Sequence, residues 1–566
     1  MPRASAVSPD NLCDPPPMNS NGHADIVLTG GAIQTMDSAR SWARALAIKG
    51  EGIQAVGTEK DIAPLIGPRT RVVDLEDRLV VPGFQDVHVH PVSSGVDRLR
   101  CDLTGSIGLP RYLEIIDTYA AAHPDAQWIL GAGWSMDDFP GGIPRLEDLD
   151  RIVPDRPVFL PSRDGHTGWV NTRALEIAGI TRETPDPPDG RIERDERGEA
   201  VGALQEGAQN LVVDRIPRDT SEDLAAGLLE GQRYLHSLGI TAWQDAIVTP
   251  DIFDAYLAAA GRGDLTARVV GALWWDRERG DEQIPELVER RSRGSVGRFR
   301  ATSVKMMQDG VLENFTGAVI DPYLDRDGRT TDKRGISFID PERLPGYVTQ
   351  LDALDFQVHF HAIGDRAVRE ALDAIGAAQR ANGRTDGRHH IAHIQLIHPD
   401  DVPRFGALGV VANAQPYWAV LEGQMRNLTI PFLGPERSTW QYPFRSLRRS
   451  GAVLAMGSDW AVSTANPLVE IEVAVNRVSD LSRDDEPFLP DERLDLIDGL
   501  AAFTSGSAYV NHLDAETGTL EPGKLADLAV IDRNIFTRDA GPIGEARVLL
   551  TLVGGKAVYE DPALET

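Results

Sequence analysis

The sequence predicts an α/β fold: a (β/α)₈ barrel of the TIM type, with a small β-sandwich-like domain built from both termini and an inserted cap region. Three patterns in the 566 residues indicate this architecture. Apolar strand segments alternate with helical stretches through the middle of the chain, as in β/α units around a parallel sheet. Short β-rich segments flank that region on both sides. The connection after the first barrel strand is far longer than the others, which favours an insertion.

The middle of the chain supplies the eight strands that such a barrel needs. Between them lie amphipathic segments with helical periodicity, such as Arg366–Ala378 and Leu468–Val478. The expected strands are Val87–His90, Ile240–Asp245, Arg268–Leu273, Thr302–Met307, Gln357–His361, His390–Ile394, Val410–Ala414 and Val453–Gly457.

Four regions follow from these patterns. Residues 1–23 are rich in Pro, Ser and Asn and are expected to be a disordered tail. Residues 24–82 and 515–566 are expected to combine into one β domain. The barrel then occupies residues 83–514, and residues 91–235 are expected to form a cap over its mouth.

Composition and charge exclude several classes of protein. The chain has 57 Lys plus Arg against 86 Asp plus Glu, a net charge of −29. A surface this acidic repels nucleic acid and anionic lipid, so neither is an expected partner. No apolar run is long enough to cross a bilayer or to serve as a signal peptide. Cys13 and Cys101 cannot form a disulfide framework. We expect a cytoplasmic protein.

The strongest chemical signal is the segment Pro82–Pro91, which contains His88 and His90. In a strand, residues two apart point to the same side, so both imidazoles are aimed at one point. Neutral imidazole is the commonest protein ligand for Zn²⁺ and similar ions. Taken alone, this pair is equally compatible with a metal site and with two histidines near a strand end whose ring nitrogens are hydrogen-bonded within the protein.

Three further residues favour a metal site. His361, His393 and Asp459 each follow an apolar strand segment at its C-terminal end. Barrel enzymes build their active sites at that end of the strands. Together with the first two histidines they form a nitrogen and oxygen ligand set suited to one or two divalent ions, with zinc favoured and Mn²⁺, Fe²⁺ or Co²⁺ as alternatives.

Lys305 lies within the apolar fourth strand, where a charged amine is costly to bury. It could pair with Asp309 or extend outward to solvent. Alternatively, CO₂ could convert it into a carbamate whose carboxylate bridges two metal ions.

These motifs resemble the amidohydrolase superfamily of metal-dependent hydrolases, and within it the YtcJ-like branch that includes the N-substituted formamide deformylases. The resemblance covers nearly the whole chain after the tail. It rests on PGFQDVHVHP at 82–91, DGHTGWVNTRAL at 164–175, VKMMQDG at 304–310, HAIGD at 361–365, IAHIQ at 391–395, GSDW at 457–460 and GTLEPGKLADLAVID at 518–532.

The resemblance implies hydrolysis of a non-peptide carbon–nitrogen bond in a small N-acyl or N-formyl amide. A divalent ion would bring the pKa of a bound water toward neutrality, and Asp459 would take its proton. If only one metal is bound, a neutral histidine of the His361 and His393 region, with His393 as the candidate, could share in polarising the carbonyl. The implied ligand sets are His88 and His90 for one metal, His361 and His393 for a second, Lys305 as a bridge, and Asp459.

Several residues are candidates for substrate contact, although turn or core roles are open for some of them. Glu206 could also orient substrate, but we favour a solvated helix face for it. His359 is expected to lie deeper than His361, as packing or support. The substrate-binding candidates are His166, Asn171 and Trp134 in the cap, Tyr417 and Trp418 beyond the seventh strand, and Asp309.

Competing functions receive less support. The chain lacks a complete dinucleotide-binding fingerprint, a phosphate-binding loop and a G-x-S-x-G elbow. Hydrolysis of an ester, lactone or cyclic amide in the same site is one alternative. A non-catalytic metal-binding protein is another, although the complete ligand set opposes it. The expected partners are a small amide substrate and a second copy of the chain in a homodimer.

Overall fold

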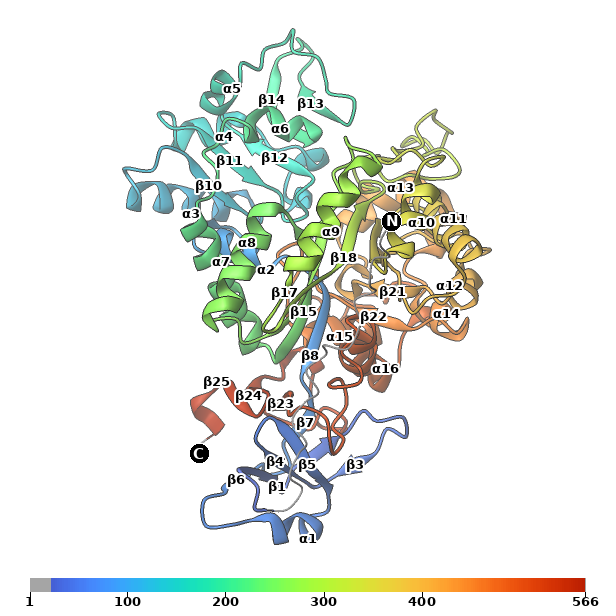
Figure 1. The fold of residues 1–566 in the computed structure, drawn as a ribbon. Helices are drawn as coiled ribbons and strands as arrows, with labels where there is room; N and C mark the ends of the chain where they lie inside the picture. The colour runs from blue at the N-terminus through green and yellow to red at the C-terminus, as the bar shows by residue number, and fades with distance from the viewer. Residues whose placement is uncertain (1–21, 565–566) are drawn as a thin grey trace, which may run out of the picture.

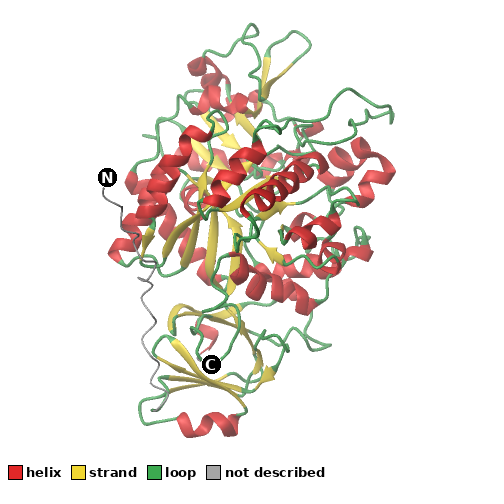
Figure 2. Ribbon diagram, turned by 45° about the vertical axis from the view of Figure 1, so that its right-hand side comes forward, coloured by secondary structure: helices red, strands yellow, loops and turns green. Residues whose placement is uncertain are grey.

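The computed structural model describes residues 22–564, and at its centre parallel strands form a nearly closed barrel (Figures 1 and 2). Neighbours around this sheet follow chain order, as a (β/α)₈ barrel requires. The strands are β8 (Phe84–Val89), β15 (Ile240–Val248), β16 (Arg268–Trp274), β18 (Phe299–Met307), β19 (Gln357–Ala362), β20 (His390–His393), β21 (Val411–Ala414) and β22 (Leu454–Met456). The predicted barrel is therefore confirmed.

Helices connect consecutive strands and cover the outside of the barrel. Their ends follow local rules: α8 (Pro250–Arg262) starts after the capping side chain of Thr249 and stops at Gly263, whose φ is +79°. No described helix has the length and apolar character that crossing a membrane requires. The other helices of this layer are α7 (Ser221–Ser237), α9 (Ile284–Arg293), α10 (Leu344–Ala353), α11 (Asp365–Asn382), α12 (Val402–Leu408), α13 (Ile430–Arg437), α14 (Phe444–Arg449) and α15 (Pro467–Asn476).

Strand β19 shows how the sequence divides between the two faces of the barrel. All six of its residues are buried. Val358 and Phe360 belong to the main apolar core, together with side chains of the surrounding helices. His359 and His361 alternate with them and so lie on the opposite face, inside the barrel. The apolar core thus lies between sheet and helices, while the interior carries polar side chains.

The two ends of the chain meet in a β-sandwich at one end of the barrel (Figure 1). C-terminal strand β23 pairs with N-terminal strand β7, and apolar side chains of both sheets share one core. Arg268 of the barrel donates to Asp527 over 2.7 Å, which ties the two parts together. One sheet contains β1 (Ile26–Thr29), β4 (Ala45–Lys49), β5 (Gly52–Gly57) and β6 (Arg71–Asp74); the other contains β2 (Ala32–Gln34), β3 (Trp42–Ala43), β7 (Leu79–Pro82), β23 (Leu528–Ile531), β24 (Val548–Val553) and β25 (Lys556–Glu560).

A separate sheet is inserted between β8 and β15, at the far end of the barrel from the sandwich (Figure 1). Helices α2 (Pro91–Arg98) and α7 flank it and pack against each other. Their contact needs glycine, because a Cβ on Gly95 would lie 1.9 Å from the carbonyl oxygen of Gly227. The insertion comprises β9 (Cys101–Asp102), α3 (Leu109–Ala122), β10 (Ile129–Ala132), α4 (Leu146–Ile152), β11 (Val158–Pro161), β12 (Thr167–Val170), α5 (Thr172–Ala178), β13 (Gly190–Arg194), β14 (Ala200–Glu206) and α6 (Asn210–Val213).

Candidate metal centre and active site

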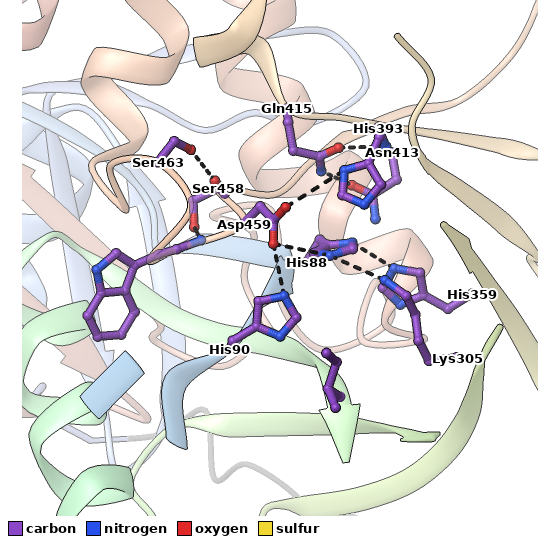
Figure 3. Close-up of polar contacts among 12 residues, drawn as sticks. His88, His90, Lys305, His359, His393, Asn413, Gln415, Ser458, Asp459 and Ser463 are labelled. Atoms are coloured by element: carbon purple, nitrogen blue, oxygen red, sulfur yellow. Dashed lines mark hydrogen bonds and ion pairs between the residues drawn. The ribbon is translucent and has the colours of Figure 1, made fainter. Parts of the chain in front are cut away.

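Three histidines converge on one carboxylate at the carboxyl ends of the barrel strands (Figure 3). Asp459 follows β22, and its Oδ1 lies 2.9 Å from Nε2 of His90 and 3.4 Å from Nε2 of His88. Its Oδ2 lies 3.8 Å from Nδ1 of His393, the last residue of β20. His88, His90 and Asp459 each offer a ligand atom, and these atoms lie within 4.8 Å of one another. The structure therefore brings together residues from both ends of the barrel sequence.

The remaining two candidate ligands border this cluster. Nζ of Lys305, on β18, lies 3.4 Å from Nε2 of His88. The ring centroid of His361, on β19, lies 4.4 Å from that of His393. All six side chains predicted as metal ligands thus line one end of the barrel.

The backbone is held in an unusual conformation at two of these residues. His393 has a φ of +75° and Asp459 a φ of +53°, in the left-handed region that non-glycine residues rarely adopt. The backbone N–H of Asp459 donates to the carbonyl oxygen of His88 over 2.7 Å, which fixes the loop across the seam between β22 and β8. Such strain persists where surrounding structure enforces it, and it clusters at functional sites.

Burial sets the charge of the cluster. It lowers the pKa of His88 to about 3, and the pKa values of His361 and His393 also fall well below the usual range. Burial lowers the pKa of Lys305 to about 7. For Asp459, burial opposes ionisation, but the neighbouring imidazole rings hold its pKa well below the ordinary value. The cluster therefore places the carboxylate of Asp459 beside the neutral imidazoles of His88, His361 and His393.

This donor set fits a divalent transition metal. Neutral imidazole and ionised carboxylate are the protonation states that bind such ions. Nδ1 of His90 and Nδ1 of His393 are buried and have no hydrogen-bond partner among the described residues. A buried ring nitrogen without a partner is costly, and a bound cation would compensate a cluster of this kind.

A cavity of about 560 Å³ opens above the cluster, between barrel and cap. His166, Tyr417 and Trp418 line it, as predicted for substrate contact. The Trp418 ring stacks on His393, with centroids 5.2 Å apart and planes inclined by 9°. This volume suits a small molecule.

Three other residues predicted to contact substrate are engaged elsewhere. Asn171 caps α5, and its amide also bonds the backbone of Val158, Val153 and Arg156. Trp134 is fully buried in the cap core and donates to the carbonyl oxygen of Leu160. Neither residue is among those that line the cavity, and each polar group is satisfied by backbone within the cap.

Asp309 is likewise not among the residues that line the cavity. Its fully buried carboxylate accepts hydrogen bonds from the backbone N–H groups of Ala318, Ile363 and Gly364. It therefore shapes the loops behind His361, whose Nε2 lies 3.7 Å away, and does not face the cavity.

Glu206 was expected on a solvated helix face, yet it ends strand β14 and lines the cavity. Its carboxylate accepts a hydrogen bond from Nδ1 of His166 over 2.9 Å, and two more from Asn314 and Thr316 of the barrel. Burial would lower the pKa of His166, but Glu206 outweighs it and raises that pKa to about 9. A polar residue at the end of a largely apolar strand was the available signal.

Two more residues of the cavity were not singled out from the sequence. They are Arg163 of the cap and Glu422, which lies on a barrel loop. Nη2 of Arg163 is 3.4 Å from Oε1 of Glu422. Both are polar residues in loops, and no local pattern distinguishes them from solvated side chains.

The barrel and the ligand cluster at its carboxyl end define a metal-dependent hydrolase. The chain belongs to the amidohydrolase family, whose sequence model matches residues 71–559.

The chain is also similar to known proteins and to solved structures. The protein LONG AFTER FAR-RED 3 of Arabidopsis thaliana is 32% identical, over 95% of this chain and 92% of its own length. An N-substituted formamide deformylase of Arthrobacter pascens is 27% identical, over 95% of this chain and 98% of its own length. A solved structure of an uncharacterized metal-dependent hydrolase from Pyrococcus furiosus superposes with a TM-score of 0.69 at 27% identity, over 90% of this chain and 99% of that one. The resemblance seen in the motifs is confirmed.

Proposed function

We propose that the protein hydrolyses a carbon–nitrogen bond other than a peptide bond, in a small N-acyl or N-formyl amide. The observation that carries this proposal is the position of Asp459, an ionised carboxylate bordered by His88, His90 and His393 at the floor of the cavity. A carboxylate in that position can move a proton between an attacking water and a leaving nitrogen.

The residues of the centre divide into ligands and catalytic groups. His88, His90 and Asp459 would hold one metal ion, and His361 and His393 a second. Carbamylated Lys305 would bridge two ions, since a pKa of about 7 makes the neutral amine that reacts with CO₂ available. We propose zinc as the metal, because imidazole and carboxylate suit it.

A divalent ion supplies Lewis acidity, which makes water more acidic and polarises a carbonyl oxygen. Asp459 takes the proton of the attacking water on a carboxylate oxygen and then delivers it to the departing nitrogen. If only one metal ion is bound, His393, which lies beside the same carboxylate, is free to help polarise the carbonyl group. His166, positively charged through Glu206, faces the cavity and favours the oxyanion that develops on the substrate.

The size and lining of the cavity support a small, partly aromatic or apolar substrate. Tyr417 and Trp418 offer ring faces at its wall, next to His393. The similarity to an N-substituted formamide deformylase supports a formyl or other short acyl group on the carbonyl side.

A substrate screen tests the proposal. Purified protein is loaded with Zn²⁺, Mn²⁺ or Co²⁺ and assayed against N-formyl, N-acetyl and cyclic amides, with matched esters and lactones. We expect turnover of N-formyl or N-acetyl amides, its loss after prolonged chelation, and its return on adding the metal. Turnover of only esters or lactones would replace the amide proposal with the alternative chemistry of the same site. Full activity in the chelated protein would contradict the metal centre itself.

A further inference from the structure

A chain of hydrogen bonds crosses the barrel interior beneath the candidate metal centre and ends on the His88 ring, and Figure 3 shows its last contact, between His359 and His88. It runs from Gln357 on β19 to Gln244 on β15, then to His359 on β19 and His88 on β8. All four side chains are at most 4% exposed. Because these side chains are buried, their polar atoms need hydrogen-bond partners within the protein.

Backbone carbonyls fix the direction of this chain at its far end. The amide nitrogen of Gln357 donates to the carbonyl oxygens of Arg388, over 3.0 Å, and Val510, over 2.8 Å. Both amide hydrogens are then used, and Gln357 Oε1 must accept. It accepts from Nε2 of Gln244 over 2.9 Å. The amide oxygen of Gln244 therefore faces the histidines.

Asn413 and His390 give the same orientation of the Gln244 amide independently. Nδ2 of Asn413 donates to the carbonyl oxygen of Val87 and to Nδ1 of His390, each over 3.1 Å. His390 must then carry its proton on Nε2. That nitrogen lies 3.0 Å from Oε1 of Gln244 and donates to it. Both anchors require an acceptor at this atom of Gln244.

The tautomer of His88 follows from these anchors. An amide oxygen only accepts, so Nδ1 of His359 carries the proton that it shares with Gln244 over 2.7 Å. Nε2 of His359 then has a lone pair and accepts from Nδ1–H of His88 over 2.8 Å. With its proton on Nδ1, neutral His88 presents the Nε2 lone pair to the side of Lys305 and Asp459.

We propose that Gln244 and His359 are positioning residues that hold His88 in the tautomer able to bind a metal ion through Nε2. The other tautomer would direct an N–H at the cation. Hydrogen bonds from neighbouring groups commonly fix the tautomer of a metal-binding histidine, and their loss weakens metal binding about 10- to 100-fold. This inference rests on the proposed metal centre, but the tautomer itself is a property of the protein alone.

Substitutions at His359 test the role through metal affinity. His359→Leu removes the acceptor, whereas His359→Gln keeps an amide oxygen that can accept from His88. His236→Leu is the matched control, since His236 is a buried histidine bonded to Ile240 and Thr266 away from the centre. Affinity for Zn²⁺ is measured by competition with a chelator, and Co²⁺ absorption spectra report the ligand geometry.

We expect His359→Leu to bind Zn²⁺ at least about tenfold more weakly and to shift the Co²⁺ spectrum. His359→Gln and His236→Leu should both remain close to the unsubstituted protein. Unchanged affinity and spectrum in His359→Leu would overturn the inference, and so would equal weakening in His359→Gln or His236→Leu. In either case the unsubstituted protein would still bind metal, so the proposed function would stand.

Neutron diffraction from the unsubstituted, metal-free protein provides a test that needs no variant to fold. We expect deuterium on Nδ1 of His88, on Nδ1 of His359 and on Nε2 of His390. Deuterium on Nε2 of His88 would overturn the inference, whether or not the protein proves to bind a metal.

Discussion

The carboxylate of Asp86 joins the first strand of the barrel to the loop after the last one, by accepting hydrogen bonds from Ser458. The hydroxyl of Ser458 donates to Asp86 Oδ2 over 2.5 Å, and its backbone N–H lies 3.1 Å from Oδ1. The same Oδ1 accepts from the N–H of His88 over 3.0 Å. His88 donates to Asp86 directly, and Asp459 follows the donor Ser458 in the chain. One buried carboxylate thus positions both candidate ligands.

Replacement of Asp86 should therefore disturb both the fold and the metal centre. Asp86→Ala leaves buried donors without an acceptor, which costs about 1–3 kcal/mol for each such group. We expect a lower Tm and weaker Zn²⁺ binding, measured by calorimetry and chelator competition. Asp86→Asn retains one acceptor oxygen and should lose less of both. Equal losses in the two variants would show that the bonds to Ser458 and His88 do not matter.

Asp459→Asn should abolish most turnover without unfolding the protein. Asparagine has the same shape and tolerates the left-handed backbone at this position, but it cannot accept the proton of water. We expect kcat to fall by about 10²- to 10⁴-fold, with most of the metal and the circular dichroism spectrum retained. Near-normal kcat would exclude Asp459 as the proton acceptor.

Lys305→Ala should lose metal and activity, and short carboxylic acids should restore part of both. The acids would occupy the space of the missing carbamate and supply its carboxylate. Metal content and rate are measured with and without formate, acetate and propionate. The same acids should not restore Asp459→Asn, whose side chain leaves no space. A Lys305→Ala variant with unchanged metal and rate would remove the carbamate bridge.

The ion pair of His166 and Glu206 should stabilise the protein at neutral pH but not at high pH. The pKa of His166 is raised from 6.5 to about 9 in the folded state. Its contribution is therefore complete below pH 6.5 and disappears as the pH rises through about 9. We expect the Tm difference between the unsubstituted protein and His166→Gln to shrink over this range.

A second histidine supplies the control for that measurement. Burial lowers the pKa of His236 to about 4, so this side chain stays neutral between pH 6.5 and 9. The corresponding Tm difference for His236→Gln should stay constant. A constant difference for His166→Gln as well would show that the Glu206 contact does not depend on a charged imidazole.

Local sequence patterns were sufficient to locate the barrel strands and the ligand cluster. His361, His393 and Asp459 each follow an apolar segment, and the parallel arrangement of those segments places their carboxyl ends together. The same logic did not anticipate the surroundings of Asn171 and Asp309, because a polar side chain near a strand end can also satisfy backbone groups. The predicted tail at 1–23 lies almost entirely outside the described residues, and homodimer formation stays a prediction.

By itself, the sequence determined the order of strands and helices and the six clustered candidate ligands, since both depend on periodicity and on residue type at strand ends. Only the tertiary structure decided what supports them. Glu206 meets His166 across the cap, and Gln244 reaches His88 through His359, with partners drawn from distant strands. Such contacts depend on atomic distances in the folded chain, which no local pattern of residues encodes.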